Sequence, residues 1–461
     1  MSTLPAPAFS RPYVISWNLT YRCNLACEHC YLDAGGKPKL EDDDAFADRG
    51  ELSTEECKRV IDEIATFAPE SVTILTGGEP LLRRDILQII RYAAAKELWV
   101  VVGTNGVSVT ETLARLLKDE GVRGLALSLD ALDADRHDDF RRVRGAWLNT
   151  VNGAKTLAKV GLPFIVQTTV GAHNAAELEA IADFAHDTLG AKVWNLYFLV
   201  QTGRGQFVTD LDAAGYSGVL ADLSRIQKKY KDRMVCNAKC APHYVKRQFE
   251  EDVDNPFARV YEGGAGGCPA GTHYMGIRPN GDVTPCPYLP VFGGSLRRDS
   301  LANLWNSSAA FVEIRDRNSL EGRCGACELS AHCGGCRARA YGVHGSVLAE
   351  DPICDHEPGT FADALARALD EAGDGGENAF AATRDRLAVG SQRFGTEAST
   401  RVAWDDDARE RMKRIPLFVR GMVVQRVEKW CREQGKPRVT LAELEALRSR
   451  MPTPKIFGES D

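Results

Sequence analysis

The chain has 461 residues, more than one hydrophobic core usually supports, so we expect two or three domains. Hydrophobic residues make up 44% and charged residues 26%, as in an ordinary globular protein. The net charge of −7 argues against a general binder of nucleic acids or anionic membranes. No apolar run approaches the roughly 18 residues of a membrane span, and the N-terminal segment lacks the features of a signal peptide. We therefore expect a cytoplasmic protein that neither spans a membrane nor binds nucleic acid.

Fourteen cysteines are many for such a chain, because clustered thiols in a reducing cytosol more often bind metal than form disulfides. Cys57 and Cys431 stand alone inside helical patterns, and we expect them to be small buried side chains. The other cysteines fall into groups and are candidate metal ligands. These groups lie at 23/27/30, 236/240, 268/286, 324/327/333/336 and 354.

From residue 12 to 205, short β-rich segments alternate with amphipathic helical ones. The first helical segment opens with Ser53 and Glu56, the capping box that marks a helix N-terminus. The strand segments are apolar rather than alternating, which is typical of a parallel sheet covered by helices. A span of about 190 residues is short for a closed eight-fold barrel, so we predict an α/β fold with a partial (β/α)6 TIM-like barrel. Its expected strands lie at 13–19, 71–77, 98–105, 124–130, 163–170 and 193–200, and its helices at 53–68, 84–97, 110–120, 146–160 and 174–189.

The rest of the chain changes character several times. Residues 206–266 lose the alternation, and we expect a polar, helix-rich bridge there. Glycine, proline and cysteine increase in 267–360, where Asn280–Gly281 predicts a hairpin turn and metal binding is expected to hold the domain together. Residues 361–402 are predicted to be a linker, and 403–461 a small helical domain.

The first cysteine group follows the first predicted strand with the spacing C-x3-C-x2-C. Four thiolates typically hold an iron–sulfur cubane, so three leave one iron open to another ligand. Thr76–Pro80 (TGGEP) follows the second strand, and its glycines allow the backbone to approach a ligand closely. The carboxyl ends of parallel strands usually carry the chemistry of α/β proteins. A structural zinc site is the alternative, but it would need a fourth protein ligand near the trio.

This pattern resembles the radical S-adenosylmethionine (SAM) superfamily, through the three-cysteine motif, the aromatic Tyr31 after it and the G-G-E-P segment. In that family the open iron chelates SAM, and an electron from the cluster cleaves SAM to a 5′-deoxyadenosyl radical. The resemblance implies that Cys23, Cys27 and Cys30 ligate a 4Fe–4S cluster and are the catalytic residues. It also implies that residues 77–79 hold the amino group of SAM, that Ser128 contacts its carboxylate or ribose, and that Arg141 pairs with its carboxylate. The implied cofactor-binding residues are Tyr31, Gly77, Gly78, Glu79, Asn105, Ser128 and Arg141.

The later cysteines resemble the SPASM extension of radical SAM enzymes, which carries auxiliary iron–sulfur clusters. Zinc ribbons are the alternative, although seven cysteines do not divide into four-cysteine zinc sites. One of the clusters would lack a ligand, and three alternatives for it are Cys240, Cys236 or an open iron that binds substrate. The resemblance implies one cluster on Cys324, Cys327, Cys333 and Cys354, and another on Cys268, Cys286 and Cys336.

The substrate is indicated by two further resemblances. Residues 333–354 and 240–243 resemble the radical SAM/SPASM enzymes that trim siroheme-derived tetrapyrroles. Residues 404–447 resemble the C-terminal helical domain of the light-independent protochlorophyllide reductase B subunit, although a general docking module is equally consistent. Together they imply an enzyme that removes or decarboxylates tetrapyrrole side chains in heme or d1-type heme biosynthesis. An external reductant such as ferredoxin or flavodoxin would supply its electrons.

Two other functions are consistent with parts of the sequence. A radical SAM/SPASM maturase would modify a peptide, or a protein such as a sulfatase. An iron–sulfur electron carrier without catalysis would use the same cysteines, but it would not need a complete SAM site.

Overall fold

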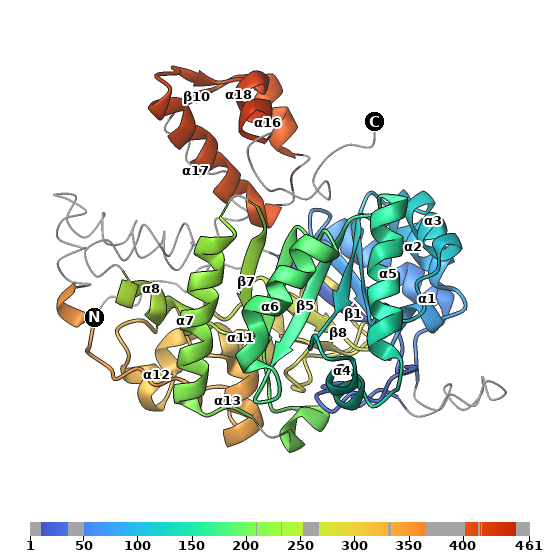
Figure 1. Cartoon of the computed structure of the whole chain (residues 1–461), viewed down its shortest axis with the longest axis horizontal. Helices are drawn as coiled ribbons and strands as arrows, with labels where there is room; N and C mark the ends of the chain where they lie inside the picture. The colour runs from blue at the N-terminus through green and yellow to red at the C-terminus, as the bar shows by residue number, and fades with distance from the viewer. Residues whose placement is uncertain are drawn as a thin grey trace.

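The computed structural model of the chain describes residues 11–35, 50–208, 210–231, 233–251, 267–330, 333–364, 402–413, 415 and 417–448. It contains one large sheet with helices packed along it, and a smaller helical unit near the C-terminal end (Figure 1). None of the helices within these ranges is long and apolar enough to cross a membrane. Most of the predicted linker, residues 365–401, lies outside the described residues.

In the described part of the chain, the sheet has the strand order β7-β6-β5-β4-β3-β2-β1-β8-β9. All neighbouring strands pair in parallel except β8 and β9, which are antiparallel. Consecutive strands from β1 to β7 are neighbours, and the two ends of the sheet do not pair, which confirms the predicted partial barrel. The strands are β1 (Val14–Asn18), β2 (Val72–Thr76), β3 (Trp99–Thr104), β4 (Gly124–Ser128), β5 (Phe164–Val170), β6 (Val193–Phe198), β7 (Val235–Lys239), β8 (Tyr274–Ile277) and β9 (Val283–Thr284).

Helices cover one face of the sheet, which we call the outer face. Side chains on this face, such as Trp17 and Trp194, are fully buried in the main hydrophobic core. Residues of the opposite, inner face alternate with them; some are partly exposed, as Gln167 of β5 is, and others are buried, as Asn18 of β1 is. The first helix begins with the predicted capping box between Ser53 and Glu56. The helices of the barrel are α1 (Thr54–Phe67), η2 (Pro80–Leu82), α2 (Ile86–Ala95), α3 (Glu111–Asp119), α4 (Ala134–Arg141), α5 (Ala146–Val160), η3 (Ala175–Glu177), α6 (Leu178–Asp183), η4 (Phe184–Thr188), η5 (Gly203–Phe207) and α7 (Ala213–Lys229).

The predicted bridge, 206–266, contains a strand that the sequence did not indicate. β7 pairs in parallel with β6 and forms one edge of the sheet. Its sequence is VCNAK, in which only Cys236 is buried, while Asn237 and Lys239 lie on the inner face. Because β7 lacks the apolar run that marks the other strands, the six predicted units omit one parallel strand.

The cysteine-rich region begins with a hairpin at the other edge of the sheet. β8 pairs in parallel with β1 and antiparallel with β9, and Gly281 adopts φ +87° in the turn. These contacts confirm the hairpin predicted at Asn280–Gly281. Short helices follow, many of them separated by irregular loops (Figure 1). The helices on either side of the hairpin are α8 (Tyr244–Glu251), α10 (Leu301–Ser307), α11 (Ala309–Arg315), η6 (Arg317–Ser319), α12 (Gly322–Ala326) and α13 (Arg337–His344).

The C-terminal residues form a small unit with its own hydrophobic core. Cys431 is fully buried in this core, and Cys57 is fully buried in the main core. Both isolated cysteines are therefore small buried side chains, as the sequence predicts. The elements of this unit are β10 (Ala403–Trp404), which pairs in parallel with β11 (Arg438–Val439), and the helices α16 (Asp406–Lys413), α17 (Leu417–Glu433) and α18 (Leu441–Arg448).

A buried arginine attaches the cysteine-rich region to the carboxyl ends of β6 and β7. Arg339 of α13 donates from Nε to the Leu199 carbonyl oxygen (3.1 Å) and from Nη2 to the Cys240 carbonyl oxygen (2.7 Å). Its Nη1 lies 3.0 Å from a carboxylate oxygen of Asp351, and both side chains of this ion pair are 0% exposed. Each buried charge therefore depends on the other for its solvation.

Replacing Arg339 by leucine should strongly destabilise the fold, because Asp351 and two carbonyl groups would stay buried without their donor. Removing one partner of a buried ion pair costs about 3–5 kcal/mol. Urea denaturation followed by tryptophan fluorescence measures the change in the free energy of unfolding. The control is Arg115→Leu, which removes an exposed pair with Glu111 and should cost less than about 1 kcal/mol. Equal losses in the two variants would contradict this role of Arg339.

Candidate active site and cysteine groups

The segment that carries Cys23, Cys27 and Cys30 follows the carboxyl end of β1, as predicted, and we call residues 19–35 the three-cysteine loop. Cys23 and Cys27 are buried and Cys30 is half-buried. Backbone amides approach two of the sulfurs: Leu25 N lies 3.4 Å from Cys23 Sγ, and Ala34 N lies 3.4 Å from Cys30 Sγ. Such N–H···S contacts stabilise thiolate charge and tune the potential of a cluster. Burial raises the pKa of Cys23 to about 12, so this thiol is protonated at neutral pH unless it binds a metal.

Arg141, at the end of α4, lies against the same loop. Its Nε donates to Asp130 Oδ2 (2.6 Å), and its Nη1 lies 3.5 Å from Cys27 Sγ. Burial alone would raise the pKa of Asp130, but the Arg141 charge lowers it to about 2. The Thr169 amide donates to the other oxygen of this carboxylate (2.8 Å). The resemblance implied that Arg141 contacts SAM, and in the structure its guanidinium contacts Asp130 and the Cys27 sulfur.

The two glycines of the TGGEP segment allow its backbone to pair with the three-cysteine loop. Gly78 N donates to the Thr20 carbonyl oxygen and Glu79 N to the Arg22 carbonyl oxygen, both at 2.7 Å. A Cβ on Gly78 would lie 2.1 Å from the Arg22 oxygen, and one on Gly77 would lie 2.7 Å from the Thr20 oxygen. The close approach that requires glycine is therefore between two segments of the chain, whereas the sequence led us to expect it toward a ligand.

Glu79 is fully buried and joins the ends of β2 and β3. It accepts hydrogen bonds from Thr104 Oγ1 (2.9 Å) and from the Asn105 amide (2.8 Å). Burial raises the pKa of this carboxyl to about 7, although the hydrogen bonds oppose the shift. Asn105 in turn donates from Nδ2 to Asn24 Oδ1 of the three-cysteine loop (2.7 Å). Ser128 is half-buried at the carboxyl end of β4, on the inner face. The structure thus brings Glu79, Asn105 and Ser128 to the carboxyl ends of the neighbouring strands β2, β3 and β4.

No prediction from the sequence included Arg204, which binds the same loop from the segment after β6. Its Nε donates to the Cys27 carbonyl oxygen and its Nη2 to the Ala34 carbonyl oxygen, both at 2.8 Å. Gly203 beside it has φ +56°, and a Cβ there would lie 2.5 Å from the Cys30 carbonyl oxygen. The only local signal was the Gly-Arg-Gly sequence at 203–205, which does not reveal contacts with residues so distant in the chain.

Tyr31 connects the three-cysteine loop with the cysteine-rich region. Its hydroxyl donates to Asn18 Oδ1 of β1 (2.8 Å), and its ring centroid lies 4.5 Å from that of Tyr288. Tyr288 in turn lies 6.4 Å, centroid to centroid, from Tyr197 of β6. We call Tyr31, Tyr288 and Tyr197 the tyrosine row. It extends from the first cysteine group to the inner face of the sheet.

Cys240 lies with Cys268, Cys286 and Cys336 in a second hydrophobic cluster. Burial raises the pKa of the Cys286 thiol, and the neighbouring Cys240 and Cys268 thiols raise it further. Cys236 belongs instead to the main core on the outer face. Of the two cysteines proposed to complete this group, the structure brings only Cys240 to it. Cys240 adopts φ +56°, a left-handed conformation that directs the chain away from β7.

The remaining cysteines form a third group around one cavity. Gly335 adopts φ +59°, and a Cβ there would lie 2.8 Å from Cys324 Sγ, so this glycine makes room for the thiol. The amides of Asp351 and Gly335 lie 3.4 Å from Cys324 Sγ and Cys333 Sγ, respectively. The thiols that line the cavity are those of Cys324, Cys327, Cys333 and Cys354.

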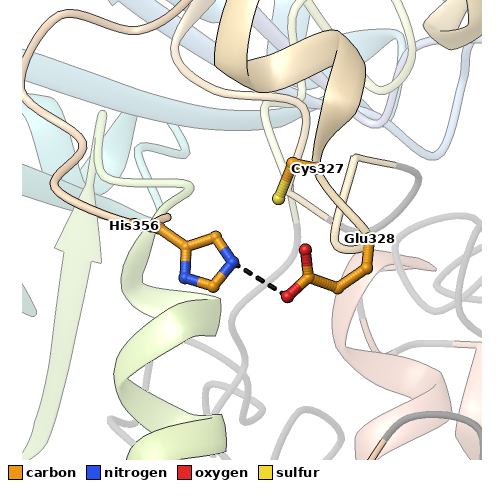
Figure 2. A group of neighbouring side chains, drawn as sticks. All are labelled: Cys327, Glu328 and His356. Atoms are coloured by element: carbon orange, nitrogen blue, oxygen red, sulfur yellow. Dashed lines mark hydrogen bonds and ion pairs between the residues drawn. The ribbon is translucent and has the colours of Figure 1, made fainter. Parts of the chain in front are cut away.

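Beside this cavity, Glu328 and His356 face each other next to Cys327 (Figure 2). His356 Nε2 lies 3.0 Å from Glu328 Oε1, and the Glu328 carboxylate also accepts hydrogen bonds from the Gly359 and Phe361 amides, both at 2.8 Å. The glutamate therefore holds residues 356–361 in place beside the thiols.

Three family models match the chain. The radical SAM superfamily model matches residues 17–185, the SPASM iron-sulfur cluster-binding domain matches 268–328, and a model of the proto-chlorophyllide reductase 57 kD subunit matches 404–448. The AdoMet-dependent heme synthase of Methanosarcina barkeri is 37% identical over 76% of this chain and 97% of its own length. The chain belongs to the radical SAM superfamily.

Other radical SAM proteins are similar over most of the chain. The pre-heme d1 synthase of Dinoroseobacter shibae is 30% identical over 74% of this chain and 85% of its own length. The mycofactocin maturase MftC of Mycobacterium tuberculosis is 31% identical over 74% of this chain and 83% of its own length. The crystal structure of Streptococcus suis SuiB bound to S-adenosylmethionine has a TM-score of 0.59 over 75% of this chain and 78% of its own, at 17% identity, which shows the shared fold.

Within the described residues, no three thiols of this radical SAM enzyme lie close enough together to share one zinc ion. In a tetrahedral zinc site with bonds of about 2.3 Å, the sulfurs lie about 3.8 Å apart. All fourteen cysteines lie among the described residues and are free. No three of their sulfurs lie within 4.8 Å of one another, and the one such group of possible ligands in the described residues is Cys327, Glu328 and His356. Thiolates are the usual ligands of iron–sulfur clusters, so these all-cysteine groups fit the cofactors of the family, which are SAM, the 4Fe–4S cluster that binds it and one or two auxiliary 4Fe–4S clusters.

Replacing Gly78 by alanine should displace the three-cysteine loop, because the added Cβ would overlap the Arg22 carbonyl oxygen. We expect the reconstituted variant to lose most SAM cleavage and about four iron atoms per chain, measured by nucleoside chromatography and iron analysis. The control is Gly218→Ala in α7, where a Cβ would have no neighbour within 4 Å. A Gly78 variant with the iron content and SAM cleavage of the control would contradict the expected displacement.

Proposed function

We propose that this radical SAM enzyme removes or decarboxylates side chains of a siroheme-derived tetrapyrrole in heme or d1-type heme biosynthesis. The observation that carries the proposal is the 37% identity with the AdoMet-dependent heme synthase, which extends over 97% of that protein. The similarity to the pre-heme d1 synthase supports the same class of substrate. The match of residues 404–448 to a proto-chlorophyllide reductase subunit is independent support from another part of the chain.

In this proposal, Cys23, Cys27 and Cys30 ligate the cluster that binds SAM. When bound, this cofactor pair supplies the 5′-deoxyadenosyl radical that takes a hydrogen atom from the substrate. Arg141 stabilises negative charge on the Cys27 sulfur, which it approaches to 3.5 Å. Arg204 donates hydrogen bonds to two carbonyl groups of the three-cysteine loop, and these bonds keep the sulfurs in position when SAM binds and dissociates.

The carboxyl ends of β2 to β4 would bind SAM. The Glu79 carboxylate has lone pairs that do not take part in hydrogen bonds within the protein. A cationic amino group beside it would favour its ionised form. Asn105 and Ser128 would contribute polar contacts at the neighbouring strand ends. Tyr31 would close the site on the side of the cysteine-rich region.

The other two cysteine groups would ligate auxiliary clusters, one of them completed by Cys240. These clusters would exchange electrons with an external reductant such as ferredoxin or flavodoxin, and we place the reaction in the cytoplasm. The proposed ligands are Cys240, Cys268, Cys286 and Cys336 for one cluster, and Cys324, Cys327, Cys333 and Cys354 for the other.

Modification of a peptide or protein is the second candidate function. Its support is the 31% identity with the mycofactocin maturase MftC, which covers 83% of that protein. This identity is lower than that with the heme synthase, and it leaves the C-terminal unit unexplained.

The test of function uses reduced, anaerobically reconstituted protein with SAM and either siroheme or iron coproporphyrin III. We expect a tetrapyrrole to accelerate formation of 5′-deoxyadenosine, and mass spectrometry to show loss of side-chain mass from it. Cys27→Ala is the inactive control. Absence of SAM cleavage under all conditions would contradict both candidate functions. Turnover of a peptide encoded by a neighbouring gene, with no effect of tetrapyrroles, would favour the second.

The assignment of Cys240 is tested by iron content. Cys240→Ala should lose about four of about twelve iron atoms per chain, because one auxiliary cluster would lack a ligand. Cys236→Ala, four positions earlier, in β7 and in the main core, should keep the full iron content. Loss of iron from the Cys236 variant alone would reverse the assignment.

A further inference from the structure

Lys239 is the last residue of β7 and lies on the inner face of the sheet. Its register partner in β6 is Tyr197, and the register partner of Asn237 is Asn195. Asn237 Nδ2 donates to Asn195 Oδ1 (3.1 Å), which places this pair on the same face. Since side chains of a strand alternate between faces, Lys239 lies on the inner face two residues beyond Asn237.

Lys239 has no counter-ion among the described residues. It forms no hydrogen bond or ion pair there, although its side chain is only partly exposed. Its neighbours on the inner face, Tyr197 and Gln167, have neutral side chains, and Gln167 Nε2 donates to the Tyr197 hydroxyl (3.2 Å). Lysines of the helices before and after β7 do pair with carboxylates: Lys229 of α7 with Glu179, and Lys246 of α8 with Asp355. A half-buried ammonium without a partner carries a desolvation cost that an anionic ligand would offset.

The tyrosine row leads from the three-cysteine loop to this lysine. Tyr31, Tyr288 and Tyr197 offer aromatic side chains at successive centroid distances of 4.5 Å and 6.4 Å. Tyr197 is the register partner of Lys239 in the neighbouring strand. Near the carboxyl ends of β6 and β7, the tyrosine row therefore lies beside Lys239, which has no counter-ion in the described residues. Aromatic side chains and a lysine together are the chemistry that recognises an aromatic ring system bearing a carboxylate.

We propose that Lys239 binds a carboxylate of the substrate, with the tyrosine row beside the substrate's ring system. This inference rests on the proposed tetrapyrrole function and adds a residue that fixes the orientation of the macrocycle. Holding one carboxylate at β7 limits which side chain can lie near the SAM site at the carboxyl ends of β2 to β4. Lys239 is thus a determinant of which carboxylate-bearing side chain reacts.

A competing role for Lys239 follows from its position next to Cys240. Its charge could instead balance the negative charge of the thiolates in that cysteine group. The two roles predict different measurements. A substrate contact changes affinity for a carboxylate and leaves the clusters unaltered. A charge-balancing contact changes the potential or electron paramagnetic resonance signal of an auxiliary cluster without affecting the discrimination between acid and ester.

The test compares coproporphyrin III, which has four carboxylates, with its tetramethyl ester, using fully reconstituted protein under anaerobic conditions. Absorbance titrations give the dissociation constants for wild type, Lys239→Gln, Lys239→Arg and the control Lys155→Gln, an exposed lysine of α5. We expect Lys239→Gln to bind the acid about tenfold to a hundredfold more weakly and the ester as well as wild type does. Lys239→Arg should retain most of the affinity, and Lys155→Gln all of it.

Equal affinity of wild type and Lys239→Gln for the acid would overturn the inference while leaving the proposed function intact. An equal loss of affinity for acid and ester would also overturn it, because the effect would then not depend on the carboxylate. A shifted auxiliary-cluster signal with unchanged porphyrin affinity would assign Lys239 to charge balance instead. Failure of wild type to bind either porphyrin would contradict the proposed function, and the inference with it.

Discussion

Hydrogen bonds from the half-buried Arg204 and the buried Arg339 to backbone carbonyl groups hold the cysteine-bearing loops against the sheet, and the rest of the site depends on them. These loops have little regular structure, so many of their carbonyl groups need donors from elsewhere in the chain. Arg204 donates to the carbonyl groups of Cys27 and Ala34, and Arg339 to those of Leu199 and Cys240. A guanidinium suits this role because its donors are fixed in one plane and it remains charged.

These contacts bring the first cysteine group and Cys240, distant in the chain, to the carboxyl ends of the strands. The first group follows β1, and Cys240 follows β7 at the opposite side of the parallel sheet. Between them, the inner face carries polar and aromatic side chains, whereas the outer face is sealed by helices. A substrate that lies between the first group and Cys240 would therefore contact the inner face, where Lys239 and the tyrosine row lie.

Much of this arrangement can be predicted from the sequence, because it depends on local patterns. The spacing of Cys23, Cys27 and Cys30, the apolar strands, the capping box and the Asn280–Gly281 turn each report on neighbouring residues. The strand β7 could not be recognised, since its inner-face residues are polar and it lacks the apolar run of the other strands. The choice between Cys240 and Cys236 depends on where that strand ends. The roles of Arg204 and Arg339 depend on contacts across more than one hundred residues, which no local pattern contains.

The hydrogen bonds to the three-cysteine loop predict that the polypeptide positions this loop even before a metal binds. Hydrogen–deuterium exchange of the metal-free chain tests it directly, because exchange reports local opening of backbone hydrogen bonds. We predict that amides of the three-cysteine loop, such as Glu28 N bonded to the Phe140 carbonyl oxygen (3.0 Å), are protected nearly as well as those of the sheet. Exchange of this loop at the rate of an unstructured peptide, with protection appearing only after iron and sulfide are added, would contradict the claim.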